Sequence, residues 1–216
     1  MDIPTNLVPD PGSDPAPERA GDDERSSSTR RRLEEALAAS VAEKGLPATT
    51  IADVVRLAGT SKRTFYEHFS DKDDCFLSLY RTRSDALMDA VEATLQPGAA
   101  PATVQLHDAA AAFITFLVAD PALGRAHVVD ISAIGERGMA VRREVVDRHA
   151  TSLLRMLARA DAAGTDVRQL SHTEAVCVVG GLNEIGLRAL DPHDPESMTA
   201  LVESATRFMQ AVMLVD

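Results

Sequence analysis

The sequence has no tryptophan and few other aromatic residues: six phenylalanines and two tyrosines among 216 residues. It also has only two cysteines, Cys75 and Cys177, which are about a hundred residues apart and form no CxxC pair. Without a second thiol at ligand spacing, a cysteine-based metal site is excluded. This usage predicts two reduced thiols in a reducing compartment, with a single long-range disulfide as the alternative.

Long apolar runs are missing as well. The longest apolar windows, 109–119 and 175–182, are shorter than the roughly 20 residues that a membrane-spanning helix needs. Residues 1–28 have no apolar segment of the kind found in signal peptides; they are rich in proline and serine. We therefore expect a soluble, cytoplasmic protein with no membrane partner and with a disordered acidic tail over residues 1–28.

Basic residues are outnumbered, 22 Lys and Arg against 33 Asp and Glu, for a net charge of −11. An acidic surface repels phosphate, so the total argues against a general polyanion binder. The charge is unevenly distributed, however. Residues 29–69 contain seven bases and five acids, and acids exceed bases on both sides. This basic island is the segment in which a nucleic-acid site is to be sought.

Helical periodicity recurs from residue 29 onward, and strand alternation is absent. The pattern predicts an all-α fold with a short N-terminal unit and a larger helical bundle behind it. We expect domains at 29–70 and 71–216. The expected helices are 29–44, 50–58, 61–69, 70–95, 102–119, 121–135, 137–163, 171–190 and 195–214.

Two short helices in the basic island are predicted to form a helix-turn-helix. Thr50 with Asp53 has the pattern of a capping box, Gly45 is placed to end the preceding helix, and Gly59 lies at the turn. Ser70 with Asp73 repeats the capping-box pattern. A second helix of this kind can lie in the major groove, which is about 12 Å wide.

The second short helix has side chains suited to DNA. Hydroxyls, cations and polar ring tips alternate with Phe65 and Phe69, which are four residues apart and can face inward. Lys62 and Arg63 alone would indicate only a solvated surface. The capping, the turn glycine and the aromatic pair together favour DNA binding.

The run from Thr50 to Phe69, TIADVVRLAGTSKRTFYEHF, resembles the DNA-binding signature of the TetR (tetracycline-repressor-like) family. The resemblance extends over about residues 30–80 and implies a helix-turn-helix followed by a ligand-binding, dimerising helical domain. By position, Thr50 and Ser61 resemble phosphate-holding caps, and Lys62 and Arg63 resemble base-edge readers. Many family members have glycine at the position of Arg63, so the operator cannot be transferred from relatives.

The resemblance implies a set of DNA-contacting residues: Thr49, Thr50, Thr60, Ser61, Lys62, Arg63, Thr64, Tyr66, His68 and Lys72. Of these, Thr64, Tyr66, His68 and Lys72 are expected to contact the backbone. The run Arg30-Arg31-Arg32 is either a solvated helix start or a basic arm that tracks phosphates or enters the minor groove.

Resemblance also implies a homodimer in which two C-terminal helices of each subunit, 171–190 and 195–214, form a four-helix interface. Gly180 and Gly181 lie inside the first of these helices. They allow a close helix approach at the interface, leave space beside a ligand, or are a local irregularity.

An effector pocket is expected within the bundle, since apolar stripes there are interrupted by a few polar groups. The candidate ligand-binding residues are Leu106, Phe113, Phe116, Leu117, His149, Leu153, Met156 and Asn183. Taken singly, residues of these types at such spacing are more often core residues than ligand contacts.

Catalytic, metal-binding and cofactor motifs are not evident, and His172-Thr173-Glu174 lacks the cysteine half of a zinc-deaminase motif. We therefore expect no enzyme and no cofactor. The sequence predicts a homodimeric, ligand-responsive transcriptional repressor that reads a palindromic operator and is released by a small apolar or amphipathic effector. An activator of the same fold, an all-α enzyme and a protein-interaction module are the alternatives.

Overall fold

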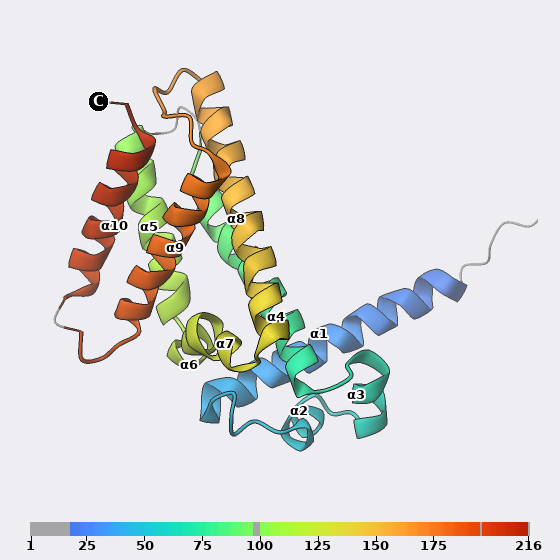
Figure 1. The fold of residues 1–216 in the computed structure, drawn as a ribbon. Coiled ribbons are helices and arrows are strands. Elements are labelled where there is room, and N and C mark those ends of the chain that lie inside the picture. The colour runs from blue at the N-terminus through green and yellow to red at the C-terminus, as the bar shows by residue number, and fades with distance from the viewer. Residues whose placement is uncertain (1–17, 97–99, 195, 216) are drawn as a thin grey trace, which may run out of the picture.

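The computed structural model describes residues 18–96, 100–194 and 196–215. The long helix α1 and the short helices α2 and α3 lie beneath a helical bundle (Figure 1). The helices are α1 (Glu18–Lys44), α2 (Ile51–Leu57), α3 (Lys62–His68), α4 (Lys72–Glu92), α5 (Ala102–Val118), α6 (Pro121–Arg125), the π-helical turn η1 (Ala126–Asp130), α7 (Ile131–Ala133), α8 (Glu136–Ala162), α9 (His172–Ala189) and α10 (Met198–Met213). The predicted all-α class is confirmed.

The N-terminal unit has its own aromatic core. Phe65 and Phe69 of α3 are 0% and 1% exposed, and their ring centroids are 5.6 Å apart. They pack with buried Leu33 and Leu37 of α1 and Val54 of α2. Burial of these rings fixes the rotation of α3, so its opposite face must point outward.

The turns of this unit follow the sequence. Gly45 and Gly59 have φ angles of 80° and 61°, a backbone region that disfavours residues with a Cβ atom. Thr50 and Asp53 form the predicted capping box at the start of α2, and Ser61 caps α3 by accepting a hydrogen bond from the Thr64 N–H. These local signals set the two short helices at an angle.

Helix α1 begins earlier than predicted. It starts at Glu18 instead of residue 29, so residues 18–28, expected to belong to a disordered tail, are helical. No proline occurs after Pro17 in this stretch, and nothing else in it stops a helix from extending. Residues 25–28 are exposed, so this extension is solvated. The rest of the predicted tail, 1–17, lies outside the described residues.

Helix α4 connects the two parts of the molecule. Its cap is Asp71, which accepts from the Asp74 N–H, and not Ser70 as the predicted box required. Ser70 instead donates through its N–H and hydroxyl to the Asp74 carboxylate. A carboxylate at the N-cap is the stronger acceptor, which accounts for the one-residue difference.

The single helix predicted over 121–135 is divided into α6, η1 and α7. Asp120 and Pro121 start it as expected. The π turn then inserts one extra residue, and His127 becomes buried with its ring stacked on Tyr80 at 4.3 Å. The sequence gives no sign of this insertion, because residues 126–130 contain neither glycine nor proline and their apolar pattern resembles that of an ordinary α-helix.

Packing is continuous across the predicted boundary at residue 70. Phe76 and Tyr80 of α4, together with Leu123 and Val141, belong to the same buried cluster as Phe65. The domain division at 70/71 stays a prediction, and the two parts share a core where they meet.

The remaining helices form a bundle around α5. Phe113, Ile114 and Leu117 of α5 are buried against Met209 of α10 and other residues of this second cluster. Gly186 of α9 allows this approach, since a Cβ atom there would lie 2.4 Å from Leu117 Cδ1. Sequence analysis singled out Gly180 and Gly181 and missed this position.

Three further points concern the ends of the elements. Ser197 caps α10, so the helix begins at Met198, three residues later than the start of the expected range 195–214. Val167 and Leu214 form an isolated antiparallel bridge. Over the described ranges, no single helix is long and apolar enough to cross a membrane, although by length and composition alone the pair Ala102–Val118 and Pro121–Ala133, bent by 103°, could.

Candidate nucleic-acid interface and ligand cavity

The outward face of α3 presents cationic and polar side chains. Lys62 and Arg63 are exposed, the Arg63 side chain to 90%, and Tyr66 is 57% exposed. Arg63 Nε donates to Glu67 Oε1 at 3.1 Å, one helical turn away. This contact orients the guanidinium and is weak enough at the surface to be exchanged for another acceptor.

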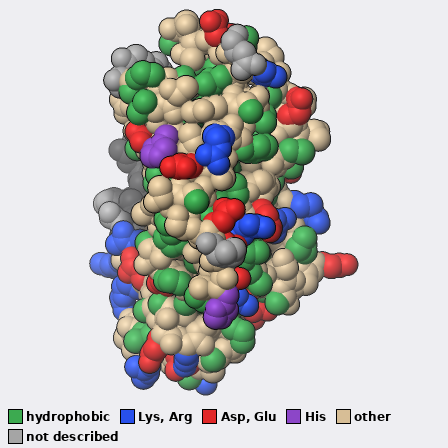
Figure 2. Space-filling model, turned by 90° about the vertical axis from the view of Figure 1, so that its left-hand side faces the viewer, with side chains coloured by type: hydrophobic (Ala, Val, Ile, Leu, Met, Phe, Trp, Pro, Cys, Tyr) green, Lys and Arg blue, Asp and Glu red, His purple; other side chains and the backbone are tan. Residues whose placement is uncertain are grey.

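Lys and Arg side chains gather at the lower end of the molecule, where α1 to α3 lie, and fewer charges cover the upper part (Figure 2). Arg56 of α2 adds to the cations exposed in this unit, with 66% of its side chain accessible. It was missed among the candidates, although its place on the exposed side of α2 follows from the pattern of Val54 and Val55. The basic island predicted from the sequence is thus a basic region of the surface.

The caps lie beside this face. Thr50 and Ser61 are exposed, and their hydroxyls already serve the N-termini of α2 and α3. Asp53 pairs with Lys44 Nζ at 2.6 Å and bonds to Thr50, so the pKa of its carboxyl lies below the usual range. Thr60, Thr64 and His68 are half-buried at the margins of the same surface.

Two of the expected DNA contacts have structural roles instead. Thr49 is 2% exposed, and its hydroxyl donates to the Gly45 carbonyl at 2.9 Å. Lys72 Nζ donates to the carbonyl oxygens of Leu46 and Thr49 at 2.8 and 3.0 Å. The Thr49 side chain therefore cannot reach a phosphate, which corrects that prediction. The Lys72 ammonium is half-buried, and its bonds hold α4 against the turn before α2.

All three arginines of the run 30–32 are exposed, and two of them also bond within the molecule. Arg30 donates to the His68 carbonyl and to Ser78 Oγ, and its guanidinium lies 4.4 Å from the Phe69 ring centroid. Arg32 donates to the Ala58 carbonyl at 2.6 Å. The Arg31 side chain is 74% exposed beside Glu35, and the Arg30 side chain is 45% exposed. Arg30 and Arg32 fasten α1 to the short helices, and the basic arm stays a prediction.

A polar network that the sequence analysis did not foresee supports Arg30. Glu34, 6% exposed, accepts from Ser78 Oγ at 2.6 Å and from Thr82 Oγ1 at 3.2 Å, and lies 3.6 Å from Arg30. The network joins α1 to α4 directly behind α3. The signal was an acid, Glu34, next to Leu33 on the inner stripe of α1.

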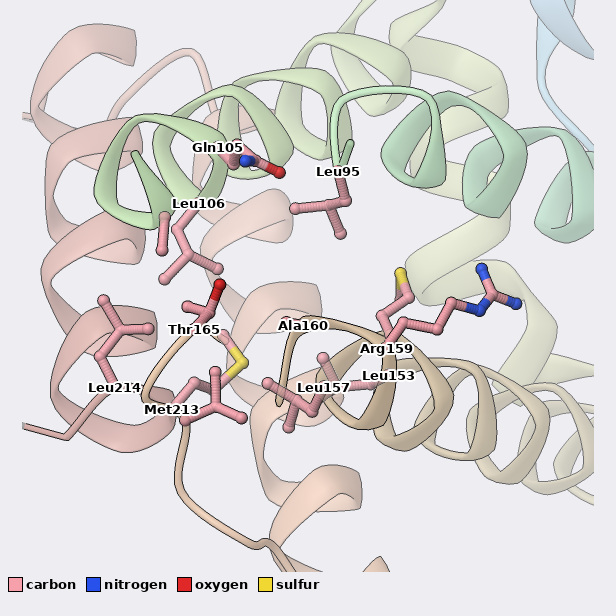
Figure 3. Close-up of a pocket in the computed structure, with 13 residues that line it drawn as sticks. Leu95, Gln105, Leu106, Leu153, Leu157, Arg159, Ala160, Thr165, Met213 and Leu214 are labelled. Carbon is pink, nitrogen blue, oxygen red and sulfur yellow. The ribbon is translucent and has the colours of Figure 1, made fainter. Parts of the chain in front are cut away.

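An apolar cavity of about 120 Å³ lies at the far end of the bundle (Figure 3). Leu95, Leu106, Leu153 and Leu157 form part of its wall, with Arg159, Gln105 and Thr165 as its polar residues. A second, smaller cavity of about 60 Å³ shares Leu95, Leu106, Leu153, Met156 and Met213 with the first. The pair forms one apolar region with a few polar groups.

Five of the eight candidate ligand residues line these cavities. Leu106, Leu153 and Met156 line both, and Phe113 and His149 line the smaller one. Phe116, Leu117 and Asn183 line neither of these two cavities, and their role in ligand binding stays a prediction. Leu117 lies against Gly186, and the Arg83 guanidinium lies over the Phe116 ring, 5.1 Å from the ring centroid.

His149 is the buried polar group of the smaller cavity. It is 5% exposed, and its Nε2 donates to the Ser84 carbonyl of α4 at 3.2 Å. Burial lowers its pKa to about 4, so the ring is neutral at pH 7. The ring therefore links the cavity to α4 through a neutral hydrogen bond.

Comparison with known proteins agrees with both parts. The profile of bacterial regulatory proteins, tetR family, matches residues 35–79, which run from the C-terminal part of α1 through the first turns of α4. The N-terminal unit therefore matches the DNA-binding region of TetR-family transcriptional regulators. The family is one of DNA-binding regulators and not of enzymes. No curated protein matches the sequence.

Solved structures of TetR-like proteins share the whole fold. The fatty acid degradation regulator FadR from Bacillus halodurans has a TM-score of 0.68 at 18% identity, covering 84% of this chain and 94% of that one. FadR from Bacillus subtilis, solved in complex with stearoyl-CoA, has a TM-score of 0.67 at 17% identity, with 83% and 96% covered. A TetR-family regulator from Mesorhizobium loti has a TM-score of 0.64 at 19% identity, and the match covers 88% of this chain and 99% of that one. At these identities the likeness establishes the fold of the regulator.

Several cavity residues were not among the candidates. Leu95, Thr165, Val167 and Leu214 lie beyond helix ends, where periodicity carries no information about direction. Met88 and Val91, by contrast, lie one turn apart on α4 and line the smaller cavity. Their spacing could have identified them as an inward stripe.

Proposed function

We propose that the chain is a homodimeric repressor that reads a palindromic operator by placing α3 in the major groove. One observation carries the proposal: Lys62, Arg63 and Tyr66 are exposed on one side of α3, and Phe65 and Phe69 anchor the other. Lys62 and Arg63 are proposed to reach base edges. Thr50, Thr60, Ser61, Thr64, Tyr66 and His68 are proposed to contact the sugar-phosphate backbone.

The proposed effector is a molecule with a long acyl chain. The joined cavities are apolar, and the fold is that of a regulator solved with stearoyl-CoA. Their volumes of about 120 and 60 Å³ are below the roughly 300–1,000 Å³ of common ligand pockets. Binding must therefore widen them, which gives the ligand a preference for a different packing of the bundle.

Helix α4 is the proposed path from cavity to DNA. Met88 and Val91 near its C-terminal end line the smaller cavity, and Lys72 at its other end holds the turn before α2. Contacts with α8, including Arg81 with Glu144 and His149 with Ser84, connect α4 to the bundle between these points. A displaced Met88 would thus move the helix-turn-helix and change the half-site separation of about 34 Å.

Dimerisation is proposed through α9 and α10. Cys177 and Gly180 on α9, and Phe208 and Ala211 on α10, are exposed on helices with few charges. A Cβ atom on Gly180 would meet nothing within 4 Å, and one on Gly181 would contact Phe208. These small residues leave room for the close approach of a second copy.

DNA recognition is tested by fluorescence anisotropy with an operator selected by the wild-type protein. We expect Lys62→Ala and Arg63→Ala each to weaken binding about 10- to 100-fold, since a good base contact is worth about 1–3 kcal/mol. The matched control, Arg143→Ala, removes an exposed arginine of α8, outside the helices proposed for dimerisation, and should leave affinity unchanged. Wild-type affinity in both α3 variants would refute the assignment.

The effector is tested by titrating stearoyl-CoA into the protein–operator complex. Wild type should release DNA, and Leu153→Trp, which fills the shared wall of both cavities, should not, although it still binds DNA. Release that is equal in both proteins would contradict the cavity as the effector site. A reporter gene placed behind the operator distinguishes a repressor from an activator, the second candidate.

A further inference from the structure

Two side chains, Arg63 and Glu67, lie opposite the buried face of α3. Successive residues of an α-helix are rotated by about 100°, so the residues two before and two after Phe65 lie within about 20° of the direction opposite to it. Their exposure agrees, since 90% of the Arg63 side chain and 54% of the Glu67 side chain are accessible, whereas Phe65 is fully buried. Glu67 was not among the expected DNA contacts, yet it lies at the centre of the face proposed to enter the major groove.

The two side chains form a pair that leaves polar groups free. Arg63 Nε donates to Glu67 Oε1 at 3.1 Å. In the part of the chain that the structure describes, no other hydrogen bond or ion pair involves these two side chains. Arg63 therefore keeps the two terminal nitrogens of its guanidinium as donors, and Glu67 keeps its second carboxylate oxygen, Oε2, as an acceptor.

A carboxylate in the middle of this face discriminates among bases. It repels the phosphates of any DNA, so it adds little to general affinity. In the major groove guanine presents two acceptors and thymine an acceptor and a methyl group. Adenine presents its amino group beside the acceptor N7, and cytosine presents the N4 amino group as a donor with no acceptor beside it. The Glu67 carboxylate therefore favours cytosine over the other three bases.

We propose that Glu67 is a specificity-determining residue that accepts a hydrogen bond from the N4 amino group of a cytosine and holds Arg63 for a bidentate contact with a guanine. This inference rests on the proposed function, because it requires α3 to lie in the major groove. The bonded groups of the two side chains are 3.1 Å apart, and base pairs are stacked about 3.4 Å apart. The two contacts therefore fall on neighbouring base pairs, and each half-site contains two neighbouring G·C pairs.

The pair divides its contribution to recognition. Arg63 supplies attraction to guanine O6 and N7, and its bond to Glu67 restricts the orientation of the guanidinium before DNA is bound. Glu67 acts mainly by rejection, since its carboxylate faces an acceptor when guanine or thymine replaces the cytosine. An operator of this protein is thus distinguished from other DNA partly by a charge that weakens binding everywhere else.

The test is selection of DNA from a random library by the full chain and two variants. Wild type should enrich a half-site with two neighbouring G·C pairs. Glu67→Gln should lose the cytosine and accept adenine in its place, because glutamine forms a bidentate contact with adenine N6 and N7. Glu67→Ala should leave no preferred base at that position and should weaken, without abolishing, the preference for the guanine.

Fluorescence anisotropy measures the size of the effect. Replacing the cytosine by thymine in the selected operator should weaken wild-type binding about 10-fold, and Glu67→Ala should bind both operators equally. Both Glu67 variants should bind random-sequence DNA more tightly than wild type, because a charge that repels phosphate has been removed. A pair that only stabilised α3 would produce no such gain.

Glu35→Gln is the matched control, since Glu35 also pairs with an arginine four residues earlier, Arg31, but lies on α1. It should enrich the wild-type sequence. Enrichment of that same sequence by Glu67→Gln, or a wild-type half-site without neighbouring G·C pairs, would overturn the role of Glu67 and leave the proposed function intact. If wild type enriched no sequence at all, the proposed function and this inference would both be overturned.

Discussion

The helix-turn-helix and the acyl cavity are encoded in opposite ways. The first is built from neighbours in the chain, with caps, turn glycines and the Phe65–Phe69 pair all within residues 45–69. The second collects side chains from Met88 to Leu214, some beyond the ends of their helices. A surface made by consecutive residues can be predicted from a sequence, whereas a cavity made by residues of several converging helices cannot.

The two regions also differ in packing. Around Phe65 and Phe69 the core is closed, and exposed fractions are 0% and 1%. Around Leu153 and Leu157, which are half-buried, two cavities remain. A ligand-controlled DNA-binding protein needs a rigid helix-turn-helix and a bundle that can be deformed, because only the bundle must change its packing when ligand binds.

The largest expected effect is a difference in the free energy of unfolding lost when a core residue is truncated in each of the two regions. Phe65→Ala should lower the free energy of unfolding by about 3–5 kcal/mol, the usual cost of deleting a buried ring. Leu153→Ala should cost less, because its surroundings already contain empty space. Urea unfolding of both variants measures the difference, and equal losses would contradict the contrast in packing.

Acid should weaken the bundle through its buried histidines. His127 and His149 have pKa values of about 3 and about 4 in the fold, against 6.5 in an unfolded chain. Their stabilisation is complete above pH 6.5 and is lost as the pH falls toward these lower values, since the unfolded state then binds more protons. From pH 7 to pH 5 the loss should be about 2 kcal/mol for each ring.

Denaturation at pH 7 and pH 5 checks this prediction. His149→Gln should remove about half of the pH-dependent loss, and His107→Gln, whose ring is half exposed, should leave it unchanged. Arg83 and Arg142 act on His127, while Arg148 and Asp85 act on His149. An unchanged slope in His149→Gln would show that other groups titrate.

A smaller effect should arise where α1 holds α3. Arg30→Met removes bonds to Ser78 and the His68 carbonyl and leaves Glu34 without its nearest cation. We expect a loss of about 1–2 kcal/mol in stability, together with weaker operator binding. Arg31→Met, one residue along the same helix and solvated, should change the stability by less than about 0.5 kcal/mol. Similar effects of both changes would contradict the internal role of Arg30.

The smallest effect concerns a cap. Thr50→Ala should destabilise the regulator by about 1 kcal/mol, because the capping box of α2 loses its hydroxyl. Thr151→Ala, in the middle of α8, removes a hydroxyl that caps nothing and serves as the control. Thermal midpoints measure both, and no loss in Thr50→Ala would place the stability of α2 entirely in its tertiary contacts.

The particular residues explain which expectations succeeded. Caps at Thr50, Ser61, Asp120 and Ser171 were predictable, since each depends on residues at most three positions apart. The burial of Thr49 depends on Ser40 of α1, and the bonds of Arg30 depend on Ser78 of α4, so neither could be predicted from neighbouring residues. The π turn at His127 and the tight contact of Gly186 with Leu117 likewise follow from packing between distant segments.

Selection of DNA from a random library tests the central claim most directly. The wild-type regulator should enrich a palindrome with half-sites one helical turn apart, and the double variant Lys62→Ala/Arg63→Ala should enrich none. Recovery of the same palindrome by the double variant would contradict the assignment of α3 as the reading helix.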